Sequence, residues 1–156
     1  MAYNKSHRKI RYVAEKVRLA VEFLADDEGW EDPDDLCGYC ARASAMISYE
    51  LNSRDIEHSL IYSDYGHVHV RSGEYIIDVT ATQFHRDMPR VIVRSIDNMG
   101  RLQKRLDVDR QYWFASNEFK HPNELYEHQI SEDWPEEQIV NTDDLSYLPV
   151  KQKKMV

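Results

Sequence analysis

The residues of this sequence that could do chemistry are its cysteines and a group of histidine and aspartate residues further along the chain. Cys37 and Cys40 are the only two cysteines. A Val-rich run that contains His67 and His69 follows them, and Asp78 lies in the next such run. A thiol becomes a good nucleophile when a nearby imidazolium or a helix N-terminus lowers its pKa, and a carboxylate can orient the imidazole. We therefore predict that Cys40, His67 and Asp78 act as nucleophile, base and orienting group.

His67 and Asp78 are predicted to lie opposite each other in a β-hairpin. Ser72-Gly73 suits a two-residue turn because glycine adopts a positive φ without strain. That turn pairs Arg71 with Glu74, Val70 with Tyr75, Val68 with Ile77, and His67 with Asp78. Because successive side chains point to opposite faces of a strand, His67 and Asp78 share the face without the apolar residues, with Cβ atoms about 5 Å apart. Taken alone, this pair is also compatible with a weak ion pair on the protein surface.

Cys40 stands at the predicted N-terminus of a helix, just after Gly38. The first backbone N–H groups of a helix lack intrahelical partners and favour negative charge, so this position stabilises a thiolate. The N–H of Cys40 could also donate to an oxyanion. The alternative is structural, because Cys40 falls on an apolar stripe with Ala43, Ile47 and Leu51, where a small buried residue would serve packing alone.

The surrounding sequence predicts the elements that position these residues. Apolar residues recur every three or four positions over 7–26 and 39–52, which predicts two helices joined by an acidic loop over 26–35. Runs rich in Val, Ile and Tyr predict strands at 59–62, 67–71, 74–79, 90–94 and 111–115, with further helices at 97–106 and 123–130. Residues from about 145 to 156 are predicted to be a loose tail. We therefore expect residues 1–156 to form a single α+β domain, in which N-terminal helices pack on one face of an antiparallel sheet meander.

Three motifs in this order resemble those of the papain-like and transglutaminase-like cysteine enzymes, and more narrowly their compact bacterial members. The motifs are Cys40-Ala-Arg-Ala-Ser44, His67-Val-His-Val70 and Asp78-Val-Thr-Ala-Thr-Gln83-Phe84, within residues 36–84, about a third of the chain. The resemblance implies a papain-like or transglutaminase-like core, with Cys40 as nucleophile, His67 as general base and Asp78 as orienting residue. It also implies a hydrolase or acyltransferase (peptidase, deamidase or transglutaminase-like) that acts on a protein or peptide amide through a thioester.

The sequence departs from the family pattern at two points. His69 stands where the family usually has tryptophan. No upstream side chain is identifiable as the oxyanion donor of papain-like enzymes, because Asp34 and Asp35, which lie where it would sit, cannot donate when ionised. Gln83 and Tyr39 are the remaining candidates for contact with an oxyanion or a substrate, although the amide of Gln83 could instead bond to the backbone at the end of its strand.

Other functions are compatible with the same residues. Cys37, Cys40, His67 and His69 could form a tetrahedral zinc site, although zinc-binding histidines usually lie three to five residues apart on a helix. Cys37-Gly-Tyr-Cys40 also resembles the motif of thiol–disulfide exchange proteins, but no buried strand pattern precedes it. A non-catalytic binding module on the same fold is a further alternative. The cysteine-enzyme interpretation requires no cofactor and no metal.

The composition limits the partners and the location that we expect. The chain of 156 residues has 28 acidic and 20 basic side chains, a net charge of −8, and its basic clusters lie at residues 5–11 and 151–154. A nucleic-acid surface needs clustered Lys and Arg, so we predict a protein or peptide substrate and no nucleic acid. No apolar run approaches the roughly 20 residues that span a bilayer, and the first residues do not resemble a signal peptide. We therefore expect a cytoplasmic protein without membrane contact; the oligomeric state is not predicted.

Overall fold

The computed structural model describes residues 5–63, 65–114 and 117–149. Its centre is a five-stranded sheet with the strand order β4-β3-β2-β1-β5, and every neighbouring pair is antiparallel. The strands are β1 (Ser59–Tyr62), β2 (Val68–Ser72), β3 (Tyr75–Asp78), β4 (Ile92–Ser95) and β5 (Asn117–Phe119). Because β1 to β4 are neighbours in chain order, this part of the sheet is the predicted meander.

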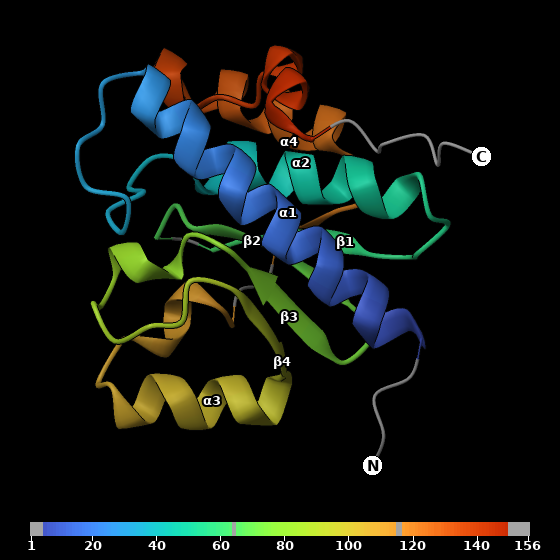
Figure 1. Ribbon diagram of the computed structural model, residues 1–156, viewed down its shortest axis with the longest axis vertical. Coiled ribbons are helices and arrows are strands. Elements are labelled where there is room, and N and C mark those ends of the chain that lie inside the picture. Colours follow the sequence, from blue (N-terminus) through green and yellow to red (C-terminus); the bar gives the residue numbers. More distant parts are fainter. Residues whose placement is uncertain (1–4, 64, 115–116, 150–156) are drawn as a thin grey trace.

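Two helices, α1 (Lys5–Asp27) and α2 (Cys40–Asn52), cover one face of this sheet (Figure 1). The apolar stripe of α1 packs against α2 and against the sheet residues Val70 and Ile77. The members of this stripe are at most 2% exposed: Ile10, Val13, Val17, Val21 and Leu24. The prediction of a mixed helix and sheet fold with its N-terminal helices on one face is confirmed. None of the helices in the described ranges is long and apolar enough to cross a membrane.

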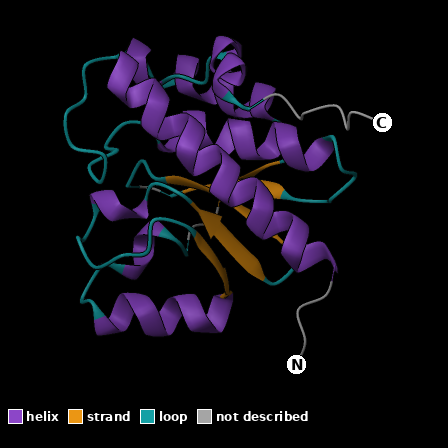
Figure 2. Cartoon of the chain, viewed as in Figure 1, coloured by secondary structure: helices purple, strands orange, loops and turns teal. Residues whose placement is uncertain are grey.

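The opposite face of the sheet is covered as well, which the sequence did not predict. Ile76 and Ile92 point away from α1 and pack with Trp113 and with the apolar side of α3 (Ile96–Arg105), which lies on the far side of the sheet (Figure 1, Figure 2). Ser95 caps α3 by accepting the backbone N–H of Asn98 at 3.2 Å. This second cover buries the polar side chains on that face instead of leaving them in water.

The β2–β3 hairpin differs from the prediction in its register. The observed pairs are Val70 with Ile77, Arg71 with Ile76, and Ser72 with Tyr75. The turn residues are therefore Gly73, whose φ of 57° suits the first central position of a type II′ turn, and Glu74. The predicted pairing of His67 with Asp78 directly across the ladder is therefore wrong. If the observed register is extended by one pair, His69 lies opposite Asp78. Because the partners shift by an even number of positions, every side chain keeps its face, and His67 still shares a face with Asp78.

The segment after α3 also differs from the prediction. Arg110–Tyr112 forms a short 3-10 helix (η2) and not a strand, because the Asp109 side chain accepts the backbone N–H of Gln111 at 2.9 Å. The end of that predicted strand, Ala115, lies outside the described residues. The additional strand is instead β5, which pairs with β1. The predicted helix that follows is present as α4 (Pro122–Ser131).

The loose tail predicted from about residue 145 does not begin there. The chain forms two short 3-10 helices, η3 (Glu136–Gln138) and η4 (Thr142–Tyr147), and Leu148 is only 7% exposed. Asp144 accepts two hydrogen bonds from the buried guanidinium of Arg42, at 2.7 and 2.8 Å. This pair fastens the C-terminal segment to α2. The rest of the predicted tail, residues 150–156, lies outside the described residues.

Candidate functional site

Cys40 is the first residue of α2, and this end of the helix is left open. Gly38 has a φ of 89°, a conformation that residues other than glycine rarely adopt. The helix has no side-chain N-cap, and no described residue accepts a hydrogen bond from the backbone N–H of Cys40, Ala41 or Arg42. The Cys40 thiol lies 3.7 Å from the carbonyl oxygen of Gly66. Unpaired N–H groups therefore lie beside the thiol, an arrangement that stabilises an anion.

His67 lies just before β2 and is held firmly in place. The backbone N–H of Ser63 donates to the carbonyl of His67 at 2.9 Å, and the N–H of His67 donates to Oγ of Ser63 at 3.1 Å. Its ring atom Nε2 lies 2.6 Å from Oδ2 of Asp78. Three aromatic rings meet the imidazole near edge-on, with centroids 4.8, 6.2 and 5.9 Å away: Phe84, Tyr112 and Trp113. The ring is thus fixed in one orientation and shielded from water, with 2% of the residue exposed.

Asp78 is a buried carboxylate surrounded by donors. Besides its contact with His67, Oδ2 accepts the indole N–H of Trp113 at 2.7 Å. Oδ1 accepts the backbone N–H of Thr80 at 2.9 Å. Charge-assisted hydrogen bonds of this kind are short and orienting. Asp78 therefore holds the imidazole with Nε2 toward the carboxylate and Nδ1 away from it.

Asp78 and His67 favour each other's charged forms. Burial acts to lower the pKa of His67, but the charge and hydrogen bond of Asp78 outweigh burial, and Cys40 adds to the increase, so the pKa is raised. Burial acts to raise the pKa of Asp78, but the charge and hydrogen bond of His67 bring it below its usual value. Since Nε2 is taken by Asp78, Nδ1 is the nitrogen left for Cys40, and it has no hydrogen-bond partner of normal geometry among the described residues. An imidazolium beside the thiol favours the thiolate.

Cys40 and His67 open into a cleft of about 600 Å³. The lining is largely aromatic and acidic, and includes Tyr62, Tyr65, Phe84, Tyr112, Glu132, Asp133 and Trp134. Ligand sites of this size usually combine apolar surface with a few fixed polar groups. The cleft can therefore bring a substrate to the thiol.

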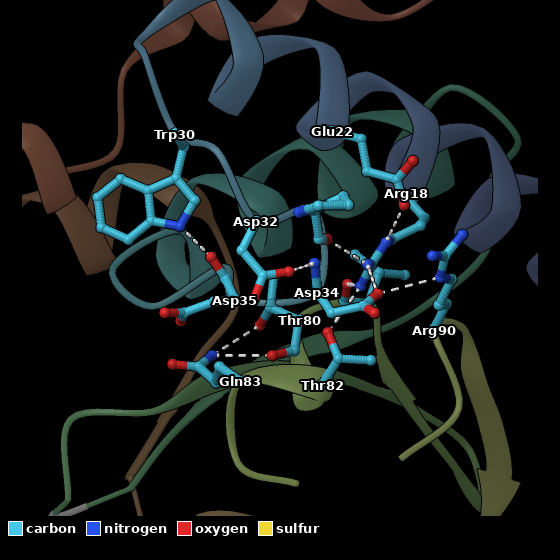
Figure 3. A network of polar contacts seen from close by, with 12 residues as sticks. Arg18, Glu22, Trp30, Asp32, Asp34, Asp35, Thr80, Thr82, Gln83 and Arg90 are labelled. Carbon is cyan, nitrogen blue, oxygen red and sulfur yellow. Dashed lines mark hydrogen bonds and ion pairs between the residues drawn. The ribbon is translucent and has the colours of Figure 1, made fainter. Parts of the chain in front are cut away.

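Gln83 and Tyr39, the candidates for oxyanion or substrate contact, are placed differently. Gln83 lines the cleft, but its amide Nε2 donates to the carbonyl of Thr80 at 2.9 Å and to its hydroxyl at 3.2 Å (Figure 3). The amide of Gln83 therefore bonds to the backbone, which is the alternative role considered for it. Tyr39 is buried and does not line the cleft; its hydroxyl instead donates to Glu28 at 2.7 Å. The structure thus brings Cys40, His67 and Asp78 together and leaves Tyr39 out.

The acidic loop before α2 is anchored by Arg18 of α1 (Figure 3). The guanidinium of Arg18 donates to the carbonyl of Val79 at 2.9 Å and to the carbonyl of Pro33, in the loop, at 2.7 Å. Asp34 lies 3.4 Å from Arg18 and 3.1 Å from Arg90. Because Val79 directly follows β3, these bonds tie the loop that leads to the thiol to the strand that carries the carboxylate.

A side chain that the sequence did not single out, Gln138 of η3, lies against the start of α2. A Cβ placed on Gly38 would come within 3.2 Å of Cγ and 3.3 Å of Nε2 of Gln138, so the amide rests on this glycine and lines the same cleft as the thiol. Its backbone is fixed by Nε2 of Gln129, which donates to its carbonyl at 3.0 Å, and by Arg42, which donates to the carbonyl of Glu137 at 2.9 Å. No described residue bonds to the side-chain amide. Only the fold reveals Gln138, because it lies far along the chain.

The four residues considered as zinc ligands are not assembled into a metal site. No group of three or more His, Cys, Asp and Glu side chains in the described part of the chain is placed to hold a metal ion. His69 is instead buried, with its ring centroid 6.3 Å from that of His67, and neither of its nitrogens has a partner among the described residues. Burial outweighs the charge of Asp78 and lowers the pKa of His69 to about 3. His69 is therefore a neutral residue behind the site.

No protein-family model matches the chain, and comparisons with curated proteins and with solved structures find no similar protein. The resemblance to papain-like and transglutaminase-like enzymes accordingly rests on the three sequence motifs alone.

Proposed function

We propose that this protein is a cysteine hydrolase or acyltransferase that attacks a protein or peptide amide and forms a thioester on Cys40. The observation that carries the proposal is the chain of contacts from Asp78 through His67 to Cys40, at the open N-terminus of α2 and in a cleft of about 600 Å³. A charged pair is expensive to bury. A charged imidazole beside a thiol is, however, an arrangement that activates a cysteine as a nucleophile.

Each residue has one role in the proposed reaction. The Cys40 thiolate bonds to the acyl carbon, and the carbonyl electron pair moves to oxygen. The backbone N–H of Cys40 and the amide of Gln138 donate to this oxyanion. His67 gives its Nδ1 proton to the leaving amine as the C–N bond breaks, which leaves a thioester. Water or an amine, deprotonated by His67, then attacks the thioester and expels the thiolate, while Asp78 keeps the imidazole in place.

The identity of the incoming and leaving groups decides the class of reaction. Water releases an acid, which is peptide cleavage or deamidation according to the amide attacked, and an amine gives a new amide. These reactions share the thioester, so a small acyl donor tests all of them at their first step.

The proposal is tested with para-nitrophenyl acetate and intact-protein mass spectrometry. We expect an acetyl adduct that is sensitive to hydroxylamine, lies on Cys40 and is absent from Cys40→Ala. The matched thiol control, Cys37→Ser, should acylate as the wild type does. His67→Ala should slow acylation about a hundredfold, within the range of general acid–base contributions. An adduct on Cys37, or equal rates for His67→Ala and the wild type, would refute the proposal.

A second candidate, thiol–disulfide exchange, is favoured by one observation: Cys37 and Cys40 line the same cleft. Against it, partial burial and the charge of Asp35 raise the pKa of Cys37, which weakens it as an attacking thiol. The cytoplasm, where we place this protein, also keeps thiols reduced. Exchange requires both cysteines, so loss of insulin reduction in both Cys37→Ser and Cys40→Ala, with no acyl adduct in the wild type, would favour it.

A further inference from the structure

One wall of the cleft joins a carboxylate to two aromatic rings. We call this set of Tyr62, Glu132 and Trp134 the Glu132 wall. The hydroxyl of Tyr62 donates to Oε1 of Glu132 at 3.0 Å, and Nε2 of His128 lies 2.7 Å from the same oxygen. The rings of Tyr62 and Trp134 have centroids 5.5 Å apart. The Glu132 side chain is 46% exposed, so the carboxylate is anchored but still open to a ligand.

The end of α4 fixes the position of this wall. Asp133 has φ of 57°, the left-handed conformation in which many helices end. The backbone N–H of Trp134 then donates back to the carbonyl of Gln129 at 3.1 Å, and Gln129 is fully buried. The C-terminus of a helix carries partial negative charge. The Glu132 wall therefore lies at the negative end of α4.

The charges around the cleft favour a cation. The hydrogen bond from Tyr62 lowers the pKa of Glu132, desolvation opposes this, and the charge of His128 adds to the decrease, so this carboxylate is ionised at neutral pH. Asp133 adds a second carboxylate, and none of the described residues that line the cleft is Lys or Arg. A cation beside a carboxylate and aromatic rings gains an ionic hydrogen bond and cation–π attraction.

The other part of the same cleft is formed by the nucleophile and its base. Cys40 and His67 both line it, and His67, which is 2% exposed, interacts with the thiol of Cys40. Next to His67 the lining is aromatic, and the ring of Tyr112 contacts those of Tyr65 and Phe84. The cleft therefore has an aromatic part beside the thiol and an acidic part at the Glu132 wall, and can distinguish the two ends of a ligand.

We propose that the Glu132 wall binds an organic cation, an alkylammonium or guanidinium group, beside the amide that Cys40 attacks; the substrate part of this proposal rests on the proposed function of Cys40. Two sources share this chemistry. One is the side chain of a Lys or Arg in a peptide substrate. The other is a free primary amine that binds as its ammonium form. The ammonium gives one proton to solvent, its nitrogen then bonds to the thioester carbon, a second proton goes to His67, and the Cys40 thiolate departs.

Binding is tested without catalysis on the Cys40→Ala variant of the full chain. n-Butylammonium chloride, the neutral analogue 1-butanol and the anion butyrate are each titrated by NMR at pH 8, where an ordinary histidine is neutral. We expect saturable shifts of the Trp134 indole with the cation, and binding of 1-butanol and butyrate that is weaker by about fivefold or more, the scale of a partly exposed ion pair.

Variants of α4 and its C-terminal end assign this binding to Glu132. Glu132→Gln should weaken n-butylammonium binding about fivefold, whereas Glu132→Asp, which keeps the charge, should retain most of it. Glu127→Gln is the matched control, because Glu127 is exposed on α4 and is not part of the cleft; it should change nothing. Equal binding of 1-butanol and the cation, or unchanged binding in Glu132→Gln, would overturn the proposal.

The wild type distinguishes the two sources of the cation. Transfer of acetyl from para-nitrophenyl acetate to n-butylamine identifies the cation as the acyl acceptor. Slower hydrolysis without transfer identifies the wall as a site for a substrate side chain, and both results support a cation site. Because the binding test needs no thioester, absence of acylation in the wild type would refute the proposed function alone, and absence of binding would refute the cation site alone.

Discussion

Replacement of His69 by phenylalanine is expected to stabilise the protein, unlike most changes of a buried residue. His69 lies on β2 opposite Ile61 and is 1% exposed. Neither ring nitrogen has a hydrogen-bond partner among the described residues. A neutral imidazole has one donor and one acceptor, so the folded state leaves both unpaired while the unfolded state pairs them with water.

The size of the effect follows from this unpaired state. Each buried polar group without a partner costs about 1–3 kcal/mol, and a slightly larger ring in a packed site costs about 1–3 kcal/mol. The substitution removes the two unpaired ring nitrogens and adds the cost of fitting one larger ring. Taking about 2 kcal/mol for each of these three terms, His69→Phe should raise the free energy of unfolding by about 2 kcal/mol at pH 7.5.

The difference in the free energy of unfolding between His69→Phe and the wild type should grow in mild acid. The pKa of His69 is about 3 when folded, against about 6.5 when unfolded, so between these values only the unfolded chain binds the proton. Stability from this group is therefore lost as pH falls below 6.5, by about 2 kcal/mol at pH 5. His67 has a raised pKa, so its contribution is fully present below pH 6.5 and declines only above. Asp78 has a lowered pKa, so its contribution is lost only in stronger acid, and neither obscures this window.

Urea denaturation at pH 7.5 and pH 5 measures both effects. His121→Phe provides the control, because His121 is exposed, and it should show neither the gain nor its growth in acid. If His69→Phe were less stable than the wild type at pH 7.5, or if its advantage did not grow by about 2 kcal/mol at pH 5, His69 would have a hydrogen-bond partner and the reasoning would fail.

Three further predictions concern the site itself. Asp78→Asn places an amide against donors from His67 and Trp113, so urea denaturation should show a loss of about 3–5 kcal/mol; an unchanged stability would mean that the pair is not charged. Iodoacetamide near neutral pH should alkylate Cys40 before Cys37 and react more slowly in His67→Ala, and peptide mapping that found Cys37 first would reverse the assignment. Gln138→Ala should slow acylation of Cys40 by about a hundredfold but leave its alkylation unchanged, because alkylation forms no oxyanion. A similar loss in both reactions would show that Gln138 only supports the fold.

Local sequence patterns were sufficient to predict the elements around the thiol and the hairpin. The three- and four-residue spacing of apolar residues identified α1 and α2, and Gly38 marked the start of the latter. The turn was misplaced because Gly73 suits either central position by its conformational freedom. The shared face of His67 and Asp78 was nevertheless predicted correctly, since any even shift in register preserves the faces.

Side chains that arrive from distant parts of the chain could not be predicted. Trp113 donates to Asp78 and closes the second face of the sheet, but its segment read as a strand because it is rich in aromatic residues. Gln138 and Glu132 lie in polar stretches that carry no periodic signal. Their positions depend on buried bonds such as the pair of Arg42 with Asp144, whose partners are 102 positions apart.

The polar face of the sheet is itself an argument for chemistry. Burial of an ion pair is often no better for stability than apolar residues of similar volume, and the unpaired nitrogens of His69 add to the cost. The same face carries Ile76 and Ile92 in a well-packed apolar cluster, so the fold can clearly fill this layer with apolar side chains. It instead places a histidine and an aspartate at the one end of the hairpin that meets the open N-terminus of α2. That location is where a charged imidazole can act on a thiol, and packing alone gives no reason for it.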